Sequence, residues 1–282
     1  MRIESKVLSC AFVLLLVACS SAPERESSDS DMSFDAPATV KNESNKEPTE
    51  VRPSIPVPAN ESQALVDAIK GGNDEAISRS AITVLSKNPN DLRALNALGM
   101  YHYKKSHWKA AELFYGRALK ANPQQAEVYN NLGLVNLAQD ERSEAIKQFR
   151  KAIELNPNEG NAAANLGSIY LAEKDYSKAA VAMEIAYRKN NRDVKIMNNY
   201  GIALTAQKKF PEAKDIYQKA HQTNPNDRDV MLNYSILLIE HLNKFADGLD
   251  LIEKLKFLGP TSEARNIING LENKAKAGLN KN

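Results

Sequence analysis

Cys19 is the residue of this chain whose chemistry stands out most clearly. It follows an apolar run, Val7–Ala18, and precedes a serine-rich segment. The only other cysteine, Cys10, lies inside the apolar run, so a chain cleaved before Cys19 would have no intramolecular disulfide and no cysteine-ligated metal site. The chemistry left to Cys19 is modification of its own thiol, and the folded part of the chain must be held together by packing alone.

The other side chains give no pattern that is typical of catalysis. The sequence contains no metal-binding H-E-x-x-H spacing, no G-x-x-x-x-G-K-[ST] phosphate loop and no G-x-S-x-G elbow. The acidic pair Asp140–Glu141 lies between expected helices, where a solvated surface is the default, and His102 occupies a packing position of the repeat described below. The four histidines are His102, His107, His221 and His241. We expect no enzymatic activity, no metal and no cofactor.

The charge distribution excludes another class of function. Residues 20–60 carry eight acidic and four basic side chains, and the remaining chain is only weakly basic, without a basic block. Such a bias is too weak to hold a phosphate backbone. We expect no nucleic-acid partner.

The N-terminal residues have the pattern of a secretion signal. Arg2 and Lys6 precede the twelve residues of Val7–Ala18, which are too few to cross a hydrocarbon core of about 30 Å as a helix. A charged start, a short apolar centre and small residues near the end are typical of a signal peptide.

The segment Leu16-Val17-Ala18-Cys19 resembles the bacterial lipoprotein signal motif. The resemblance implies that residues 1–18 are a signal peptide and that Cys19 becomes the acylated mature N-terminus, carrying palmitate or a similar chain. The alternatives are an ordinary signal peptide or an uncleaved anchor with a chance cysteine. By family analogy, Ser20 instead of aspartate favours the periplasmic face of the outer membrane over the inner membrane. Two or more acyl chains anchor a protein stably.

Residues 19–60 are expected to be a lipidated cysteine followed by a disordered tether. The segment after Cys19 holds half of the twelve prolines and a single aromatic residue, Phe34. It has too little apolar surface to offset the entropy of ordering. Such a tether lets the folded part stand away from the lipid.

The rest of the chain repeats with a period of 34 residues. Four columns share this register: Gly99, Gly133, Gly167 and Gly201; Ala111, Ala145, Ala179 and Ala213; Ala118, Ala152, Ala186 and Ala220; Pro89, Pro123, Pro157 and Pro225. A period of this length indicates a stacked array of identical supersecondary units.

The stretch YNNLGLVNLAQDERSEAIKQFRKAIELNP, starting at Tyr129, resembles the tetratricopeptide repeat (TPR). The resemblance implies an all-α fold, a right-handed superhelix of about six helix-turn-helix repeats plus a C-terminal capping helix, over residues 61–276, with residues 277–282 as a disordered tail. Gly at position 8 and Ala at positions 20 and 27 of each unit let the helices approach closely, and proline at position 32 ends the second helix.

The fit to this repeat loosens at both ends. Glu61–Lys70 and Asp74–Lys87 predict a degenerate first pair, and Thr261–Lys276 predicts a closing helix with Thr261 or Ser262 as its N-cap. In the last unit Ser235 replaces the glycine, and Gly248 and Pro260 come one residue late. We therefore expect one extra residue around His241–Lys244.

The TPR resemblance implies a peptide-binding groove along the first helix of each unit, at positions 2, 5, 9 and 12. The candidates are Asn96, Met100, Tyr103, Asn130, Leu134, Leu137, Ser168, Leu171, Asn198, Ile202, Thr205 and Ile236. This largely apolar track predicts an apolar or amphipathic client segment. Lysine at position 5 and asparagine at position 9, which TPR carboxylate clamps use, are missing. The alternative is that these residues pack within and between units.

A further column of amides recurs at position 6: Asn131, Asn165, Asn199 and Asn233. Such a ladder can bind the backbone of a peptide or tie one repeat to the next, and we favour the tie.

The combination of lipoprotein motif and about six repeats resembles pilotin-type lipoproteins, which help type IV pilus secretin subunits to assemble, and TPR lipoproteins of gliding motility. It implies a membrane-anchored periplasmic scaffold whose groove binds a secretin subunit, a motility complex or a cell-wall enzyme. The alternative is an adaptor for peptidoglycan hydrolases or proteases. The oligomeric state stays open.

Overall fold

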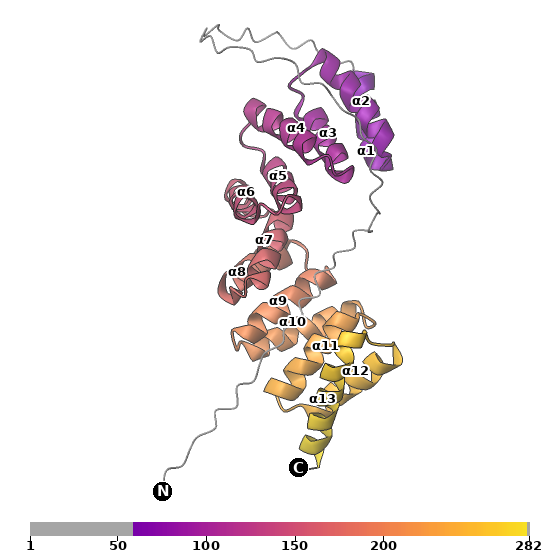
Figure 1. Ribbon diagram of the computed structural model, residues 1–282, viewed down its shortest axis with the longest axis vertical. Helices are drawn as coiled ribbons and strands as arrows, with labels where there is room; N and C mark the ends of the chain where they lie inside the picture. Colours follow the sequence, from indigo (N-terminus) through magenta and orange to yellow (C-terminus); the bar gives the residue numbers. More distant parts are fainter. Residues whose placement is uncertain (1–58, 281–282) are drawn as a thin grey trace, which may run out of the picture. The chain divides into compact units, whose positions relative to one another are not determined.

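The computed structural model describes residues 59–280, which form thirteen α-helices and one π-helical turn, with no strand in that range (Figure 1). The helices are α1 (Ala59–Gly71), α2 (Asp74–Lys87), α3 (Leu92–Lys104), α4 (Trp108–Ala121), α5 (Ala126–Ala138), α6 (Arg142–Leu155), α7 (Gly160–Ala172), α8 (Tyr176–Lys189), α9 (Val194–Ala206), α10 (Phe210–Thr223), α11 (Arg228–Ile236), η1 (Leu237–His241), α12 (Phe245–Phe257) and α13 (Ser262–Leu279). None of these helices is long and apolar enough to cross a bilayer. The expected signal peptide, Cys19 and the tether up to residue 58 lie outside the described residues.

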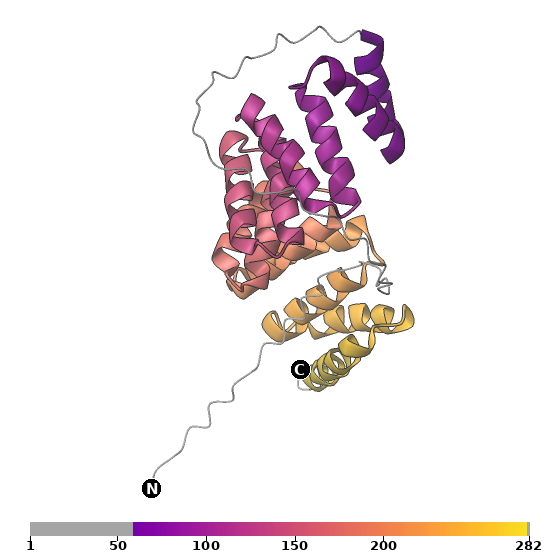
Figure 2. The same ribbon diagram turned by 45° about the horizontal axis from the view of Figure 1, so that its top comes forward.

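Consecutive helices pack as pairs, and the pairs follow one another in sequence order (Figures 1 and 2). Six helical pairs, which we call units 1 to 6, run from α1–α2 to α11–α12, and α13 packs against α12. The expected α-solenoid of six units with a closing helix is confirmed. The helical part begins at Ala59 and ends at Leu279, so α13 includes part of the stretch expected to be a disordered tail.

Within a unit, glycine on the first helix lets a large side chain of the second helix lie against its backbone. A Cβ atom added to Gly133 would lie 2.6 Å from Phe149, and one added to Gly201 would lie 2.6 Å from Tyr217. Phe149 and Tyr217 are fully or almost fully buried. The glycines that recur every 34 residues therefore mark the positions where the two helices of a unit cross closely.

The core runs along the second helices. Ala145, Phe149 and Ala152 of α6 form one cluster with Ala162 and Leu166 of the next unit. Units 2 and 5 repeat this arrangement with their own side chains. Each second helix thus packs on its own first helix and on the following one, so a single unit cannot bury its apolar face by itself.

Local side chains fix both ends of the helices. Asp91, Asp193 and Asp227 accept hydrogen bonds from backbone amides in the first turns of α3, α9 and α11. The second helices of units 1 to 5 each end at an asparagine in the same register: Asn88, Asn122, Asn156, Asn190 and Asn224. Four of these asparagines precede proline, which disfavours the helical conformation of the residue before it. This asparagine column is a stop signal additional to the proline.

The extra residue of unit 6 lies in the π-helical turn. In units 2 to 5 the amide that closes the helix–helix turn bonds a carbonyl five residues earlier, as Glu141 does with Asn136, whereas Lys244 bonds Leu238, six residues earlier. The π-helix Leu237–His241 absorbs the added residue inside the first helix. From the sequence we expected the extra residue around His241–Lys244. The π-helix begins four residues earlier, at Leu237, and overlaps the expected range only at His241. Gly248 then supplies the close approach, since its added Cβ would lie 2.4 Å from Ile239.

We predict opposite effects for two glycine substitutions in helices. Gly133→Ala should lower the free energy of unfolding by about 1–3 kcal/mol, because its methyl group overlaps the buried Phe149. Gly116→Ala, on α4, should raise it by about 0.5–1 kcal/mol, because nothing lies within 4 Å of the added Cβ and alanine favours the helix. Urea unfolding followed by circular dichroism measures both. Equal effects of the two changes would contradict the close-crossing argument.

Candidate functional site

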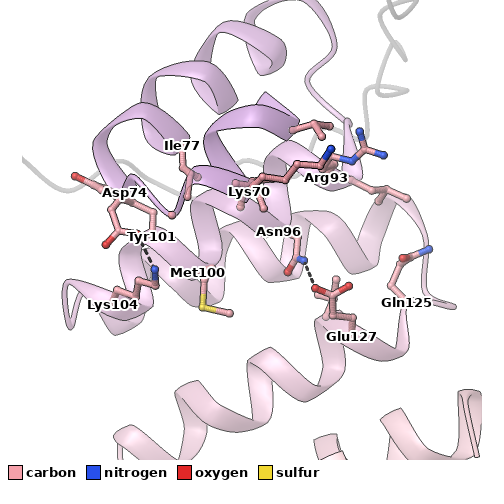
Figure 3. A pocket seen from close by; sticks show the side chains of 16 residues that line it. Lys70, Asp74, Ile77, Arg93, Asn96, Met100, Tyr101, Lys104, Gln125 and Glu127 are labelled. Carbon is pink, nitrogen blue, oxygen red and sulfur yellow. Dashed lines mark hydrogen bonds and ion pairs between the residues drawn. The ribbon is translucent and has the colours of Figure 1, made fainter. Parts of the chain in front are cut away.

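A large hollow lies at the N-terminal end of the array, between the first helical pair and the first helices of units 2 and 3. Helices α1, α2, α3 and α5 surround a pocket of about 720 Å³, which we call the N-terminal pocket (Figure 3). Its main lining residues are Val66, Ile69, Lys70, Asp74, Ile77, Leu92, Arg93, Asn96, Met100, Tyr101, Lys104, Gln125, Glu127 and Val128. Two of the predicted groove residues, Asn96 and Met100, are among them.

Apolar side chains from three helices line this pocket. Ile69 of α1 is 41% exposed, and Ile77 of α2 and Met100 of α3 are half-buried. Burial of such surface by a bound segment contributes about 25 cal/mol per Å². Sequence reasoning gave Ile69 and Ile77 no role, because the first unit departs from the repeat frame. The one sequence feature that could have identified them is the apolar face of the two short helices in this unit.

The charges around the pocket are partly paired. Lys104 Nζ lies 2.7 Å from Asp74 Oδ1, which neutralises one side of the rim (Figure 3). Glu127 on α5 accepts a hydrogen bond of 2.9 Å from the Asn96 amide. Lys70 and Arg93 are exposed, and neither forms an ion pair with another described residue.

Just outside the pocket, Glu75 of α2 connects to α3. Its carboxylate lies 3.1 Å from Lys105 Nζ and accepts a hydrogen bond from the Tyr101 hydroxyl. The hydrogen bond that Lys105 donates to the Glu75 carboxylate raises the pKa of Lys105, which therefore stays charged. These contacts fix α2 against α3 at the edge of the pocket.

The other predicted groove residues do not form one open apolar track. Leu171 and Ile202 are only 2% and 8% exposed, so they belong to the core and not to a free surface. Leu134 and Leu137 are half-buried and pack against the core cluster of units 3 and 4. Tyr103, Thr205 and Ile236 are half-buried, and Asn130 and Asn198 are buried. Packing between units, which the sequence left as the alternative, accounts for Leu171 and Ile202.

The position 6 asparagines connect neighbouring units. Asn131 donates to Asn96 at 2.9 Å, and Asn165 donates to Asn130 at 3.0 Å. The bond from Asn233 to Asn198 is also 3.0 Å long. In each case the acceptor is the position 5 amide of the preceding unit. The ladder therefore ties repeats together, as we favoured from the sequence.

Alanine interrupts the ladder at position 5 of unit 4. Asn199 faces Ala164 there, and its side chain forms no hydrogen bond with another described residue. A hollow of about 180 Å³ opens at this point, with Asn165 and the exposed Ser168 in its lining. Residues at repeat positions 5, 6 and 9 thus line this second hollow, as residues at positions 5 and 9 line the N-terminal pocket.

A third hollow lies outside the predicted groove, on helices α6, α7 and α8. It measures about 620 Å³ and is lined by apolar side chains that include Ile153, Tyr170, Val181 and Ile185. Val181 is 64% exposed. No sequence pattern marked this surface, because an exposed apolar residue on a second helix does not disturb the repeat.

The histidines of α3 and its turn form a packing contact. The His102 ring stacks on Phe114 with centroids 5.3 Å apart, and its Nδ1 lies 3.5 Å from Nδ1 of His107. Burial and the neighbouring His107 lower the pKa of His102. The packing role expected for His102 is confirmed. Among residues 59–280, no group of three or more histidine, cysteine or acidic side chains is arranged to hold a metal ion.

Comparison with known proteins agrees with this architecture. Residues 126–159 and residues 164–228 each match a family model described as tetratricopeptide repeat. No curated protein matches the chain in sequence.

Three solved structures illustrate the likeness. Pseudomonas aeruginosa pilF is 21% identical, with 75% of this chain and 96% of that chain covered and a TM-score of 0.65. YrrB, described as a TPR protein with an unusual peptide-binding site, is 18% identical, with coverages of 71% and 99% and a TM-score of 0.60. A tetratricopeptide repeat protein from Parabacteroides merdae is 17% identical, with coverages of 79% and 90% and a TM-score of 0.53. These similarities show the fold, which is the TPR α-solenoid.

We predict that two asparagines of the same column differ in their contribution to stability. Asn165→Ala should lower the free energy of unfolding by about 1–3 kcal/mol, because it leaves the buried Asn130 oxygen without its donor. Asn199→Ala is the matched control and should cost clearly less, since its side chain has no partner to lose. Urea midpoints of the two variants measure the difference. A peptide-binding role alone would give two equally small losses of stability.

Proposed function

We propose that this TPR solenoid is a membrane-anchored periplasmic scaffold, which binds client proteins in order to assemble or localise an envelope machine. The anchor would be an acylated Cys19 at the periplasmic face of the outer membrane. The client would be a secretin subunit of a type IV pilus system or a component of a gliding-motility complex.

The N-terminal pocket is the observation that carries this proposal. It combines a volume of about 720 Å³ with apolar side chains from α1, α2 and α3. Exposed apolar surface bounded by polar residues is typical of a protein interaction site. Grooves of this kind bind an amphipathic helix or an extended segment through a few apolar anchors.

The type of machine is suggested by two further observations. The lipoprotein-like motif at Cys19 points to an envelope location, and the pilF structure shares the fold over 96% of its own length. A scaffold that carries both a lipid anchor and a client site raises the local concentration of the client at the membrane. This combination is the mechanism that we assign to the chain.

We predict that acidic substitutions in the N-terminal pocket abolish client capture while the fold is retained. Ile69→Glu and Met100→Glu place a charge on apolar surface that a client would bury, which should weaken binding at least tenfold. The measurement is a pull-down from envelope extracts, with bound secretin, motility or cell-wall proteins identified by mass spectrometry.

The matched control for this prediction is Leu113→Glu, because Leu113 is 61% exposed on α4 and does not line the pocket. Ile202→Glu is unsuitable, since a charge at this core position would unfold the protein. Undiminished capture by folded Ile69→Glu and Met100→Glu variants would contradict the assignment of the pocket.

We predict that Cys19→Ser prevents lipidation and releases the protein from the membrane. Serine has no thiol to form the thioether, so metabolic labelling with radioactive palmitate should give no labelled product. When the cell envelope is fractionated, the variant should be found in the soluble fraction, whereas the parent protein should be found in the outer-membrane fraction. Cys10→Ser, which leaves the proposed acylation site intact, should behave as the parent protein. Palmitate on the Cys19→Ser variant would overturn the anchor.

A further inference from the structure

The two sides of the N-terminal pocket differ in whether their charged side chains are paired. On one side, Lys104 and Asp74 form an ion pair at 2.7 Å and cancel each other's charge. Lys70 and Arg93 lie on the other side (Figure 3). Because neither forms an ion pair with another described residue, their charges stay available to a bound partner.

The positions of these two cations in their helices differ. Lys70 is in the last turn of α1, where a positive charge interacts favourably with the helix dipole. Arg93 is in the first turn of α3, where the dipole disfavours a positive charge. The acidic N-cap of this helix, Asp91, accepts a hydrogen bond from the Ala94 amide and forms no ion pair with Arg93. The helix dipole therefore favours Lys70 at its position and disfavours Arg93. A bound carboxylate would offset the unfavourable position of Arg93.

The remaining charge of the lining is Glu127 on α5. Its carboxylate interacts with the neutral amide of Asn96, so its negative charge is not cancelled by that contact. The pocket lining therefore has two unpaired positive charges, Lys70 on α1 and Arg93 on α3, and one negative charge, Glu127 on α5. The apolar side chains of Ile69, Ile77 and Met100 line the same pocket.

We propose that the N-terminal pocket selects client segments that carry apolar side chains followed at one end by acidic side chains. This inference rests on the proposed scaffold function and names the chemistry of its client. The apolar side chains bind against Ile69, Ile77 and Met100, and the acidic side chains lie beside Lys70 and Arg93. The site differs from a TPR carboxylate clamp, because positions 5 and 9 of unit 2 are Asn96 and Met100.

The test uses two synthetic peptides and the mature chain, residues 19–282 with Cys19→Ser. Both fluorescein-labelled peptides have the same amphipathic leucine–alanine sequence of about 12 residues; one ends in three acidic residues and the other in three lysines. Fluorescence anisotropy measures both dissociation constants. We expect the acidic peptide to bind about fivefold tighter or more, and its advantage to shrink between about 50 mM and about 500 mM NaCl.

Charge-reversal variants identify the residues responsible. The double substitution Lys70→Glu with Arg93→Glu should abolish or reverse the preference, and Glu127→Lys should increase it. The matched control is Lys120→Glu with Arg142→Glu, which changes the net charge equally at exposed positions outside the pocket and should leave the preference intact. Circular dichroism confirms that each variant is folded.

Equal binding of the two peptides, no binding of the acidic peptide, or an unchanged preference in the Lys70→Glu, Arg93→Glu variant would overturn the inference. The envelope pull-down separates this failure from failure of the scaffold function. If capture depends on Met100 but not on Lys70 and Arg93, the pocket binds clients without selecting acidic ones. If the parent protein captures no client, the scaffold function itself is wrong.

Discussion

The structure depends on one close contact, repeated in every regular unit, between a glycine of the first helix and a large side chain of the second. Gly99, Gly133, Gly167 and Gly201 have no Cβ atom, and the side chain of Tyr115, Phe149, Met183 or Tyr217 occupies the space. Since the same type of close contact recurs in each of these units, successive units pack their two helices in the same way. Units of the same shape can stack, and stacking buries the apolar face that each unit exposes alone.

Polar contacts connect the stacked units. Asparagine side chains at position 6 bond the amide at position 5 of the preceding unit in three places. Two of the acceptors, Asn130 and Asn198, are buried, and these bonds give their side-chain oxygens a donor from the next unit. Part of the predicted groove is therefore an interface between repeats. Where Ala164 breaks the series, a small hollow opens instead.

One surface available to a client lies where the repeat is irregular. Unit 1 departs from the frame, and the N-terminal pocket lies between its helices and those of units 2 and 3. The degenerate first unit leaves part of the space beside units 2 and 3 open, whereas the hollow on α6, α7 and α8 lies in regular units. The irregularity at the other end is handled differently, because the π-helical turn of α11 absorbs the extra residue and keeps the core of unit 6 closed.

The sequence by itself determined the 34-residue period, the closing helix and the absence of a recognisable catalytic motif, and its resemblance to the tetratricopeptide repeat implied the all-α class and about six units. These features could be predicted because the period and the helix-end signals are local, whereas the choice of Thr261 over Ser262 as the cap came from the structure. Only the tertiary structure decided which side chains are accessible. Leu171 and Ile202 occupy the same repeat positions as half-buried neighbours, and their burial depends on how adjacent helices pack. Ile69, Ile77 and Lys70 come together with Met100 across three helices, a proximity that no periodic pattern encodes.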